Sequence, residues 1–317
     1  MTLGERNDIW LALRKDYKKE DKKRIGMTVV FLALFVHFFS YPGLFTQQLT
    51  VKDLLAFPPA PADHRIAYGD DPHQFGQLRL PKKEGLFPVA IVIHGGCWLS
   101  QYDLHHISSF ATEITKMGIA TWSLEYRRIG NKGGGWPGTF QDVAAGADYL
   151  RNLARKFPLD LERVVVIGHS AGGHLALWLA ARSKIPPQGL LHDPDPLPVK
   201  GVVSLAGVGD LILAVLQEVC GGAIPKLMGG EPVDVPDRYA QGSPLELLPF
   251  GVPQVLIQGA KDKIVPVKSV EDYYEAAAKS GDKVDLILLQ EAGHFELIMP
   301  TTFAWPEVRK AIETLIK

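Results

Sequence analysis

The sequence predicts an α/β fold in which a mostly parallel sheet carries helices on both faces. From residue 64 to the end, short apolar runs alternate with segments of helical periodicity. Continuous apolar runs are typical of strands that are buried on both faces of a sheet. Strands that alternate with helices indicate a mostly parallel sheet. The 317 residues are enough for one large domain with a single core, or for two small ones.

Seven strands are expected, and helices lie between them. The strands are residues 75–80, 88–93, 119–124, 163–167, 199–205, 254–258 and 284–289. The helices are residues 108–117, 140–157, 172–181, 270–279 and 306–316. Gly118 is a natural helix C-cap and Pro158 stops a helix, so two of these bounds follow from local chemistry.

The overall composition is ordinary for a globular enzyme. Hydrophobic residues make up 46%, charged residues make up 22%, and the formal net charge is −1. This balance indicates no nucleic-acid partner and no strongly charged substrate. Cys97 and Cys220 are too few for a disulfide framework and lack zinc-ligand spacing. We expect two small buried thiols, with one bridge as the alternative, and no metal or cofactor.

The first 50 residues differ from the rest. A basic run over residues 14–24 precedes an apolar stretch over residues 27–39. Residues 26–45 together approach the roughly 20 residues that a membrane-spanning helix needs. Three interpretations are open: a membrane anchor with the basic run in the cytoplasm, which we favour, a secretory signal, or a helix that packs on the domain or a partner. The protein is accordingly expected to be membrane-anchored, secreted or cytoplasmic.

Ser170 lies in the run Gly168-His169-Ser170-Ala171-Gly172, between an expected strand and an expected helix. A serine on such a sharp turn has strained backbone angles and close neighbours, so glycine is needed two residues away on either side. Parallel sheets form their sites beyond the C-terminal ends of the strands, and a helix N-terminus adds positive potential there. This context predicts a nucleophilic serine. The alternative is a glycine-rich turn that merely packs tightly.

A serine hydroxyl needs a base, and His294 is the best-placed histidine because it follows the last expected strand. Asp262 follows the preceding strand and is the candidate that orients the imidazole, although aspartate is also common in turns. The chain order Ser170, Asp262, His294 is the one expected for a nucleophile, an acid and a base on such a sheet. Asp210 and Asp285 are weaker candidates for the acid.

A glycine-rich loop follows the strand at residues 88–93 and has the sequence His94-Gly95-Gly96-Cys97-Trp98. Glycines allow backbone N–H groups to face a substrate carbonyl oxygen. We assign an oxyanion hole to the N–H groups of Ala171 and Gly96, with Cys97 as the alternative to Gly96. We also expect Trp98 and His169 to contact the substrate.

These motifs, together with Glu125-Tyr126-Arg127-Arg128 and Gly133-Gly134-Gly135-Trp136-Pro137, resemble the α/β-hydrolase superfamily. They are most similar to its HGG-type esterase/lipase branch, which contains kynurenine formamidase-like and feruloyl/acetyl-xylan esterase-like proteins. The resemblance covers residues 64–317 and implies the α/β-hydrolase fold. Cys97 departs from the pattern, because it replaces the third glycine of HGGG lipases and the aromatic residue of the formamidases.

The domain organisation follows from proline and from loop length. Residues 1–50 form the N-terminal segment, residues 51–63 are expected to be a Pro-rich linker, and residues 64–317 form the catalytic domain. Residues 207–250 are too long for a simple loop and predict a small cap insertion. Its apolar side chains either line a substrate pocket or only pack the insertion on the domain. They are Ile212, Leu213, Val215, Leu216, Ile224, Leu227 and Met228.

The sequence therefore predicts a serine hydrolase that cleaves a carboxylic ester of a small or medium substrate through an acyl-enzyme. One alternative is an arylformamidase, another amidase or a peptidase. A second alternative is a catalytically inactive, hydrolase-like binding protein. The expected partner is a small-molecule ester or amide, and the oligomeric state is open.

Overall fold

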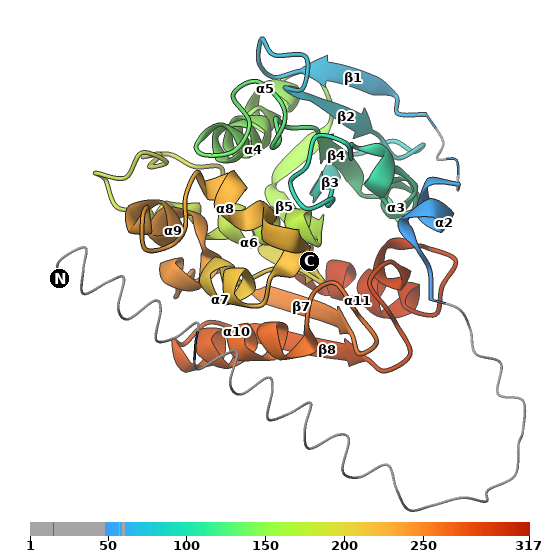
Figure 1. Cartoon of the computed structure of the whole chain (residues 1–317). Helices are drawn as coiled ribbons and strands as arrows, with labels where there is room; N and C mark the ends of the chain where they lie inside the picture. The colour runs from blue at the N-terminus through green and yellow to red at the C-terminus, as the bar shows by residue number, and fades with distance from the viewer. Residues whose placement is uncertain (1–14, 16–47, 57, 59–60) are drawn as a thin grey trace, which may run out of the picture.

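A computed structural model describes residue 15, residues 48–56, residue 58 and residues 61–317 of the chain (Figure 1). Residues 26–45, for which we expected a membrane anchor, a secretory signal or a packed helix, lie outside the described residues. Among the residues that are described, no helix is long and apolar enough to cross a membrane.

One eight-stranded sheet runs through the molecule in the order β1-β2-β4-β3-β5-β6-β7-β8 (Figure 1). The strands are β1 (His64–Ala67), β2 (Phe75–Arg79), β3 (Phe87–Ile93), β4 (Ala120–Leu124), β5 (Leu159–His169), β6 (Gly201–Leu205), β7 (Gln254–Gly259) and β8 (Val284–Leu289). Strands β3 to β8 are parallel, whereas β1 and β2 pair antiparallel at one edge. The predicted mostly parallel sheet is confirmed. Strand β1 was not anticipated, because it is largely exposed and lacks an apolar run.

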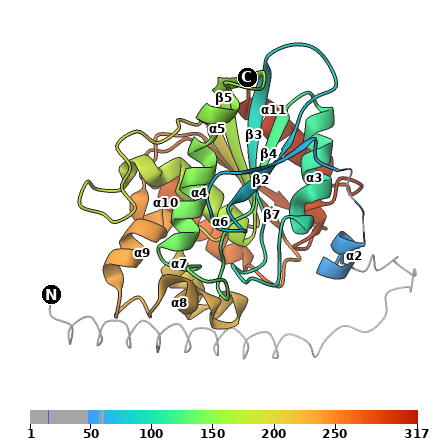
Figure 2. The ribbon, with the colours of Figure 1, turned by 90° about the horizontal axis from the view of Figure 1, so that it is seen from above.

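Helices cover both faces of the sheet (Figure 2). Helices α3 (His105–Lys116) and α11 (Trp305–Leu315) pack on one face. Helices α4 (Gly138–Asp148), α5 (Leu150–Leu153), α6 (Ala171–Ala181) and α10 (Val267–Lys279) pack on the other. The single helix expected over residues 140–157 is thus divided into α4 and α5. The 3-10 turn η1 (Arg182–Lys184) follows α6 directly.

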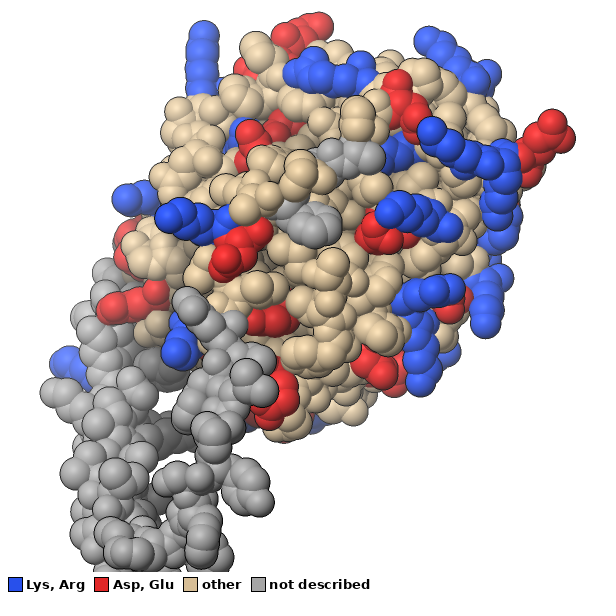
Figure 3. All heavy atoms as spheres, turned by 90° about the vertical axis from the view of Figure 1, so that its right-hand side faces the viewer, with Lys and Arg blue, Asp and Glu red and all other residues tan. Residues whose placement is uncertain are grey.

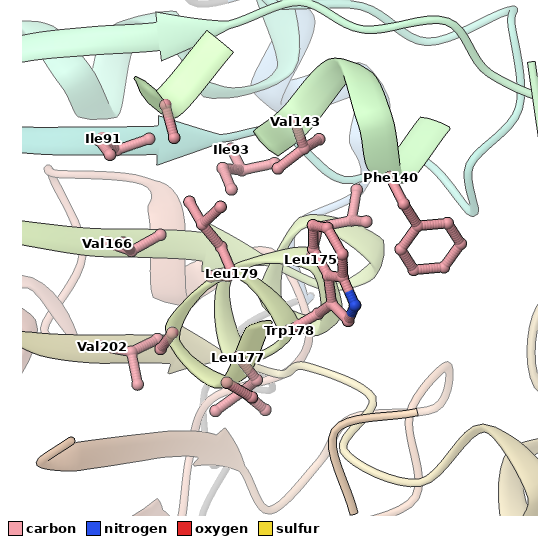
Figure 4. Close-up of a cluster of buried hydrophobic side chains, with 14 of the residues drawn as sticks. Ile91, Ile93, Phe140, Val143, Val166, Leu175, Leu177, Trp178, Leu179 and Val202 are labelled. Atoms are coloured by element: carbon pink, nitrogen blue, oxygen red, sulfur yellow. The ribbon is translucent and has the colours of Figure 1, made fainter. Parts of the chain in front are cut away.

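Side chains of the central strands enter two cores in alternation. In β3, Ile91 and Ile93 join the core under α4 and α6, while Ala90 and Val92 join the core under α3 and α11. Burial on both faces explains why the strands are continuous apolar runs. Figure 4 shows the first core, in which Ile91, Ile93, Val166 and Val202 of the strands lie with Leu175, Trp178 and Leu179 of α6 and Phe140 and Val143 of α4.

The insertion over residues 207–250 consists of short helices. These are α7 (Leu211–Leu216), α8 (Ala223–Met228) and α9 (Pro236–Gly242), with the 3-10 turns η2 (Val219–Gly222) and η3 (Pro244–Leu247). Ile224, Leu227 and Met228 are fully buried and join the core on the α6 side. These three side chains therefore pack the insertion on the domain, as the second of our two interpretations expects.

Residues 51–55, which we expected in a linker, form helix α2 (Val51–Leu55). A capping box begins the helix: the Thr50 hydroxyl accepts from the Asp53 N–H, and the Asp53 carboxylate accepts from the Thr50 N–H at 2.8 Å. Leu54 is 3% exposed and joins the core under α3. The prediction of a linker is therefore wrong for residues 51–55. It rested on the prolines of residues 58–61, and the helix with its capping box precedes them.

The face that carries α2 has mixed charge. Figure 3 shows this face, the right-hand side of Figure 1, with Lys and Arg side chains interspersed among Asp and Glu. The mixture agrees with the formal net charge of −1. A face of this kind lacks the single-sign field that steers a highly charged partner.

The substitution Leu54→Ala tests whether α2 belongs to the folded domain. Removal of a buried leucine side chain leaves a cavity and is expected to lower the free energy of unfolding by about 2–5 kcal/mol. Urea denaturation followed by tryptophan fluorescence measures this loss. Leu55→Ala is the matched control, because Leu55 on the same helix is 40% exposed. Equal stability of Leu54→Ala and wild type would show that α2 is not docked.

Candidate active site

Ser170 lies on a sharp turn between β5 and α6, at the C-terminal edge of the sheet. Its φ of +57° is a left-handed value that is strained for a residue with a side chain. Glycines make the turn possible. A Cβ at Gly168 would lie 2.0 Å from the Gly172 carbonyl oxygen, and one at Gly172 would lie 2.2 Å from the Ile93 carbonyl oxygen. The turn therefore has the close packing that the motif predicts, and Ser170 borders a cavity.

His294 and Asp262 lie together on the loops after β8 and β7. His294 Nδ1 is 2.7 Å from Asp262 Oδ2, and both side chains are buried. The carboxylate can only accept, so Nδ1 is the donor, and in the neutral tautomer Nε2 carries the lone pair. His294 borders the same cavity as Ser170. Of the weaker candidates for the acid, Asp210 caps α7 and Asp285 lies exposed on β8.

Ser170 and His294 are not joined directly. Among the described residues, no hydrogen bond connects the Ser170 hydroxyl with the His294 imidazole. Contacts between a nucleophile and its base are often long in an unliganded site and shorten in the substrate complex. The structure thus brings the two side chains to one cavity without forming the bond that proton transfer requires.

The Asp262 carboxylate also organises its own loop. Oδ1 accepts hydrogen bonds from the N–H groups of Ile264 at 2.7 Å and Val265 at 3.0 Å, which is the pattern of an Asx turn. Oδ2 accepts from Gln258 Nε2 at 3.1 Å as well as from His294. The turn contacts and the contact with His294 use different oxygens of one carboxylate, so the turn role does not exclude the predicted orienting role.

The loop after β3 brings Gly96 and Cys97 to the same cavity. Their φ values of +105° and +52° turn the chain sharply. Among the described residues, neither N–H group donates to another protein group. Ala171 is the first residue of α6, where helical N–H groups lack intrahelical partners. The two turns adjoin, since a Cβ at Gly95 would lie 3.1 Å from the Ser170 Cβ.

A buried cluster of His94, Glu125 and Arg128 supports the glycine-rich loop at its first residue, His94. The Glu125 carboxylate lies 3.2 Å from His94 Nε2 and 2.7 Å from Arg128 Nη1, and it accepts from the Leu104 N–H at 3.1 Å. Burial opposes ionisation of Glu125, but His94, Arg128 and the Leu104 N–H outweigh it and lower the pKa of the carboxyl group. Arg128 also donates to the carbonyl of Tyr102, which borders the cavity. The cluster therefore connects the loop with the cavity wall.

Cys97 and Cys220 form a disulfide bridge, so the expected pair of free thiols is wrong. The bridge joins the glycine-rich loop to η2 of the insertion across 123 residues of sequence. Only the fold brings the two loops to a Cα–Cα distance of 5.6 Å, and a single sequence carries no signal for such a pairing. The bridge gives a structural reason for the cysteine at position 97, where the resembled families have glycine or an aromatic residue.

His169 and His106 form a buried chain of imidazoles beside the His294 loop. His169 Nε2 donates to the His294 carbonyl oxygen at 2.9 Å, because a carbonyl oxygen only accepts. His169 Nδ1 is then the acceptor for His106 Nε2, at 2.8 Å. Burial, together with the neighbouring histidines, lowers the pKa of His106 to about 3 and the pKa of His169 well below its ordinary value. Both rings are therefore neutral at pH 7.

The expected substrate contacts of Trp98 and His169 are wrong. Trp98 is fully buried and packs edge-on against His174 of α6, with 5.3 Å between the ring centroids. Its φ of +55° turns the indole into the core. His169 is also fully buried and supports the backbone of the His294 loop. Proximity in sequence to a site residue did not determine where either side chain points.

The cavity beside Ser170 has a volume of about 420 Å³. Sequence reasoning missed most of its walls, which are formed by Gln48, Leu49, Thr50 and Val51 near the N-terminus and by Tyr102, His106, Lys263, Ile264 and Phe295. Lys263, Ile264 and Phe295 directly follow predicted site residues, so their position in sequence was a usable signal, whereas residues 48–51 belong to no motif. None of the seven insertion side chains named above borders this cavity. Within the described ranges, no group of three His, Cys, Asp or Glu side chains is arranged to hold a metal ion.

The BD-FAE family model matches residues 77–276, which is more than half of the chain. The chain belongs to the BD-FAE family. The matched residues of this BD-FAE protein include the glycine-rich loop, Ser170 and Asp262. His294 and the cavity-lining residues 48–51 lie outside the match.

The chain is also similar to individual proteins. It is 27% identical over 247 residues to Esterase LipC of Mycobacterium tuberculosis (strain ATCC 25618 / H37Rv), covering 74% of this chain and 60% of LipC. It is 25% identical over 250 residues to the isoprenylcysteine alpha-carbonyl methylesterase ICME of Arabidopsis thaliana, covering 74% of this chain and 56% of ICME. The chain therefore spans less than two thirds of either relative. Esterase B of Lactobacillus Rhamnosis (HN001) matches with a TM-score of 0.69 at 19% identity, covering 96% of each chain, which confirms the α/β-hydrolase fold.

The bridge between Cys97 and Cys220 is expected to contribute strongly to the stability of this BD-FAE protein. Closing a loop of more than 100 residues stabilises the native state by about 2–5 kcal/mol. The double variant Cys97→Ala/Cys220→Ala should lose this amount in guanidinium denaturation, and reductant should destabilise wild type but not the variant. Two reactive thiols in denatured, unreduced wild type would contradict the bridge.

The buried imidazoles predict that acid destabilises the fold. Ordinary histidine has a pKa near 6.5, so below about pH 6.5 the unfolded chain binds protons that buried His106 and His169 do not. Stability is therefore full above this pH and is lost as the pH falls from about 6.5 towards the folded-state pKa of about 3 for His106. Each histidine contributes a slope of up to about 1.4 kcal/mol per pH unit.

The substitution His106→Gln removes one titrating group and keeps an N–H donor for His169. The slope of unfolding free energy against pH between about pH 6 and pH 4 should become shallower than in wild type. His105→Gln, at an exposed neighbouring position, is the matched control and should keep the wild-type slope. A slope that is equal in all three proteins would rule out a buried neutral His106.

Proposed function

We propose that this chain is a serine hydrolase that cleaves carboxylic esters of small or medium substrates through an acyl-enzyme. The observation that carries the proposal is that Ser170 and His294 border one cavity, while Asp262 lies 2.7 Å from His294 Nδ1. In this arrangement the only ring nitrogen of His294 with a free lone pair is Nε2, as a general base requires. A hydroxyl, a base and an orienting carboxylate are the parts that acyl transfer by serine needs.

In the first half-reaction, Ser170 Oγ attacks the ester carbonyl carbon while its proton passes to His294 Nε2. The resulting imidazolium is stabilised by the Asp262 carboxylate. The tetrahedral intermediate collapses when its bond to the alcohol oxygen breaks. His294 returns the proton to that oxygen, so a neutral alcohol leaves and the acyl group stays on Ser170.

In the second half-reaction, water attacks the acyl carbon and gives its proton to His294 Nε2. The bond from the acyl carbon to Ser170 Oγ then breaks, and Oγ takes the proton back. The product is the carboxylic acid, and the free hydroxyl of Ser170 is restored. The same imidazole acts as base and then as acid in both halves, which is why its Nε2 must face the cavity.

The negative charge that develops on the carbonyl oxygen needs donors that are already in place. We assign them to the Ala171 N–H and to the N–H of Gly96 or Cys97. The N-terminus of α6 adds the positive end of a helix dipole at this point. The bridge to Cys220 and the Glu125 cluster support the Gly96 loop, so its N–H groups do not have to reorganise during the reaction.

The choice of an ester over an amide is supported by what the relatives are called. LipC and Esterase B are named esterases, and ICME is named a methylesterase. LipC and ICME are distant from this chain and longer than it, so the test includes amide substrates.

Ser170→Ala is expected to lower kcat on p-nitrophenyl butyrate by a factor on the order of 10⁴ to 10⁶ because the nucleophile is lost. Ser183→Ala, which changes an exposed serine after α6, is the matched control and should retain activity. Circular dichroism verifies that both variants fold. Undiminished hydrolysis by Ser170→Ala would overturn the assignment.

The same proteins separate the ester proposal from its alternatives. A fluorophosphonate probe should label wild type and Ser183→Ala but not Ser170→Ala, since only an activated serine reacts. Absence of labelling in wild type would favour the inactive binding protein. A faster rate on N-formylkynurenine or on a proline-containing peptide than on short-chain esters would favour an amidase or a peptidase.

A further inference from the structure

Four consecutive residues that precede the family match border the Ser170 cavity. They are Gln48, Leu49, Thr50 and Val51. Leu49 and Val51 are the apolar members of this wall, and both are half-buried. The backbone here leads directly into α2, which packs beside α3 (Figure 1). The segment is therefore part of the site although it lies outside residues 77–276.

Glu296 holds this segment against the loop that carries His294. It belongs to the 3-10 turn η4 (Glu296–Ile298), directly after that loop. One oxygen of its buried carboxylate accepts from the Leu49 N–H at 2.7 Å. The other accepts from the Gly293 N–H at 3.0 Å. The Glu296 side chain thus fixes the position of the cavity wall at Leu49 relative to the loop that carries His294.

Gln48 makes the second attachment, on the side of Asp262. Its Nε2 donates to the carbonyl of Lys261 at 3.1 Å. A Cβ at Gly293 would lie 3.0 Å from the Gln48 side-chain carboxamide carbon, so glycine at this position leaves room for it. The segment therefore contacts both loops that supply Asp262 and His294.

Helix α2 fixes the other end of the segment. Leu54 inserts into the core under α3, and Leu49 packs against the same core. The Thr50 capping box sets the direction in which the chain enters the helix. The wall is consequently held at both ends, which is what a pocket that discriminates substrate size requires.

We propose that Leu49 and Val51 determine which apolar group of the ester the site accepts, an inference that rests on the proposed hydrolase function. The favoured substrates are uncharged esters whose acyl or alcohol part is a medium-sized apolar group. The cavity of about 420 Å³ lies in the lower part of the range for small-molecule sites. Leu49, Val51, Ile264 and Phe295 give it apolar walls, and Lys263 is the one Lys, Arg, Asp or Glu side chain among its described lining residues.

The test measures selectivity in full-length variants. Leu49→Trp and Val51→Phe shrink the pocket, and Leu49→Ala enlarges it without steric overlap. Lys52→Ala is the matched control, because Lys52 directly follows Val51, is exposed and does not border the cavity. Two substrate series are used: p-nitrophenyl esters from acetate to dodecanoate, and acetates of linear alcohols from methanol to octanol. Thermal unfolding verifies that each variant folds.

We expect the ratio of kcat/KM for the C8 substrate to that for the C2 or methyl substrate to fall on the order of tenfold in the shrunken variants. In Leu49→Ala the optimum should move to longer chains. The change should occur in one of the two series, which identifies whether the acyl or the alcohol part occupies the cavity. Lys52→Ala should keep the wild-type ratios.

Two results would overturn the proposal, and they are distinguishable. If the folded Leu49 and Val51 variants keep wild-type ratios in both series while fluorophosphonate labelling persists, the wall has no selective role and the hydrolase proposal stands. If wild type neither hydrolyses any substrate nor reacts with the probe, both proposals fail.

Discussion

The close contact between the Ser170 turn and the end of β3 is the constraint on which the site depends. Ile93 of β3 pairs with Gly168 of β5, and the Gly172 Cα lies where any Cβ would overlap the Ile93 carbonyl oxygen. Strands β3 and β5 therefore end at the same edge of the sheet, and the loops that follow them lie in contact. Tightly packed neighbours on both sides of Ser170, at Gly168 and Gly172, over-determine the turn and so maintain its strained φ.

Groups that take no part in bond breaking hold the loops around this turn. The bridge between Cys97 and Cys220 ties the glycine-rich loop to the insertion, and the Glu125 cluster supports it from behind. His169 holds the backbone of the His294 loop through a carbonyl. Such supports matter because donors and bases act only when they stand at the required distance before the substrate arrives.

The cavity is lined in part by residues that lie outside the family match. Residues 77–276 contain the Ser170 turn and the glycine-rich loop, whereas Gln48 to Val51, which border the cavity, lie outside this range. This segment leads into α2, which packs beside α3 and contributes Leu54 to the core. The proposed selectivity of Leu49 and Val51 would therefore depend on residues that lie outside the family match.

The sequence by itself determined the parallel sheet, the Ser170 elbow and the loops of Asp262 and His294, because apolar runs and glycine spacing are local patterns. Tertiary structure decided what no local pattern encodes: the bridge over 123 residues, the cavity walls and the docking of α2. It also turned Trp98 and His169 away from the cavity. The reason is physical, since a side chain's direction depends on backbone φ and on neighbours that are distant in the chain.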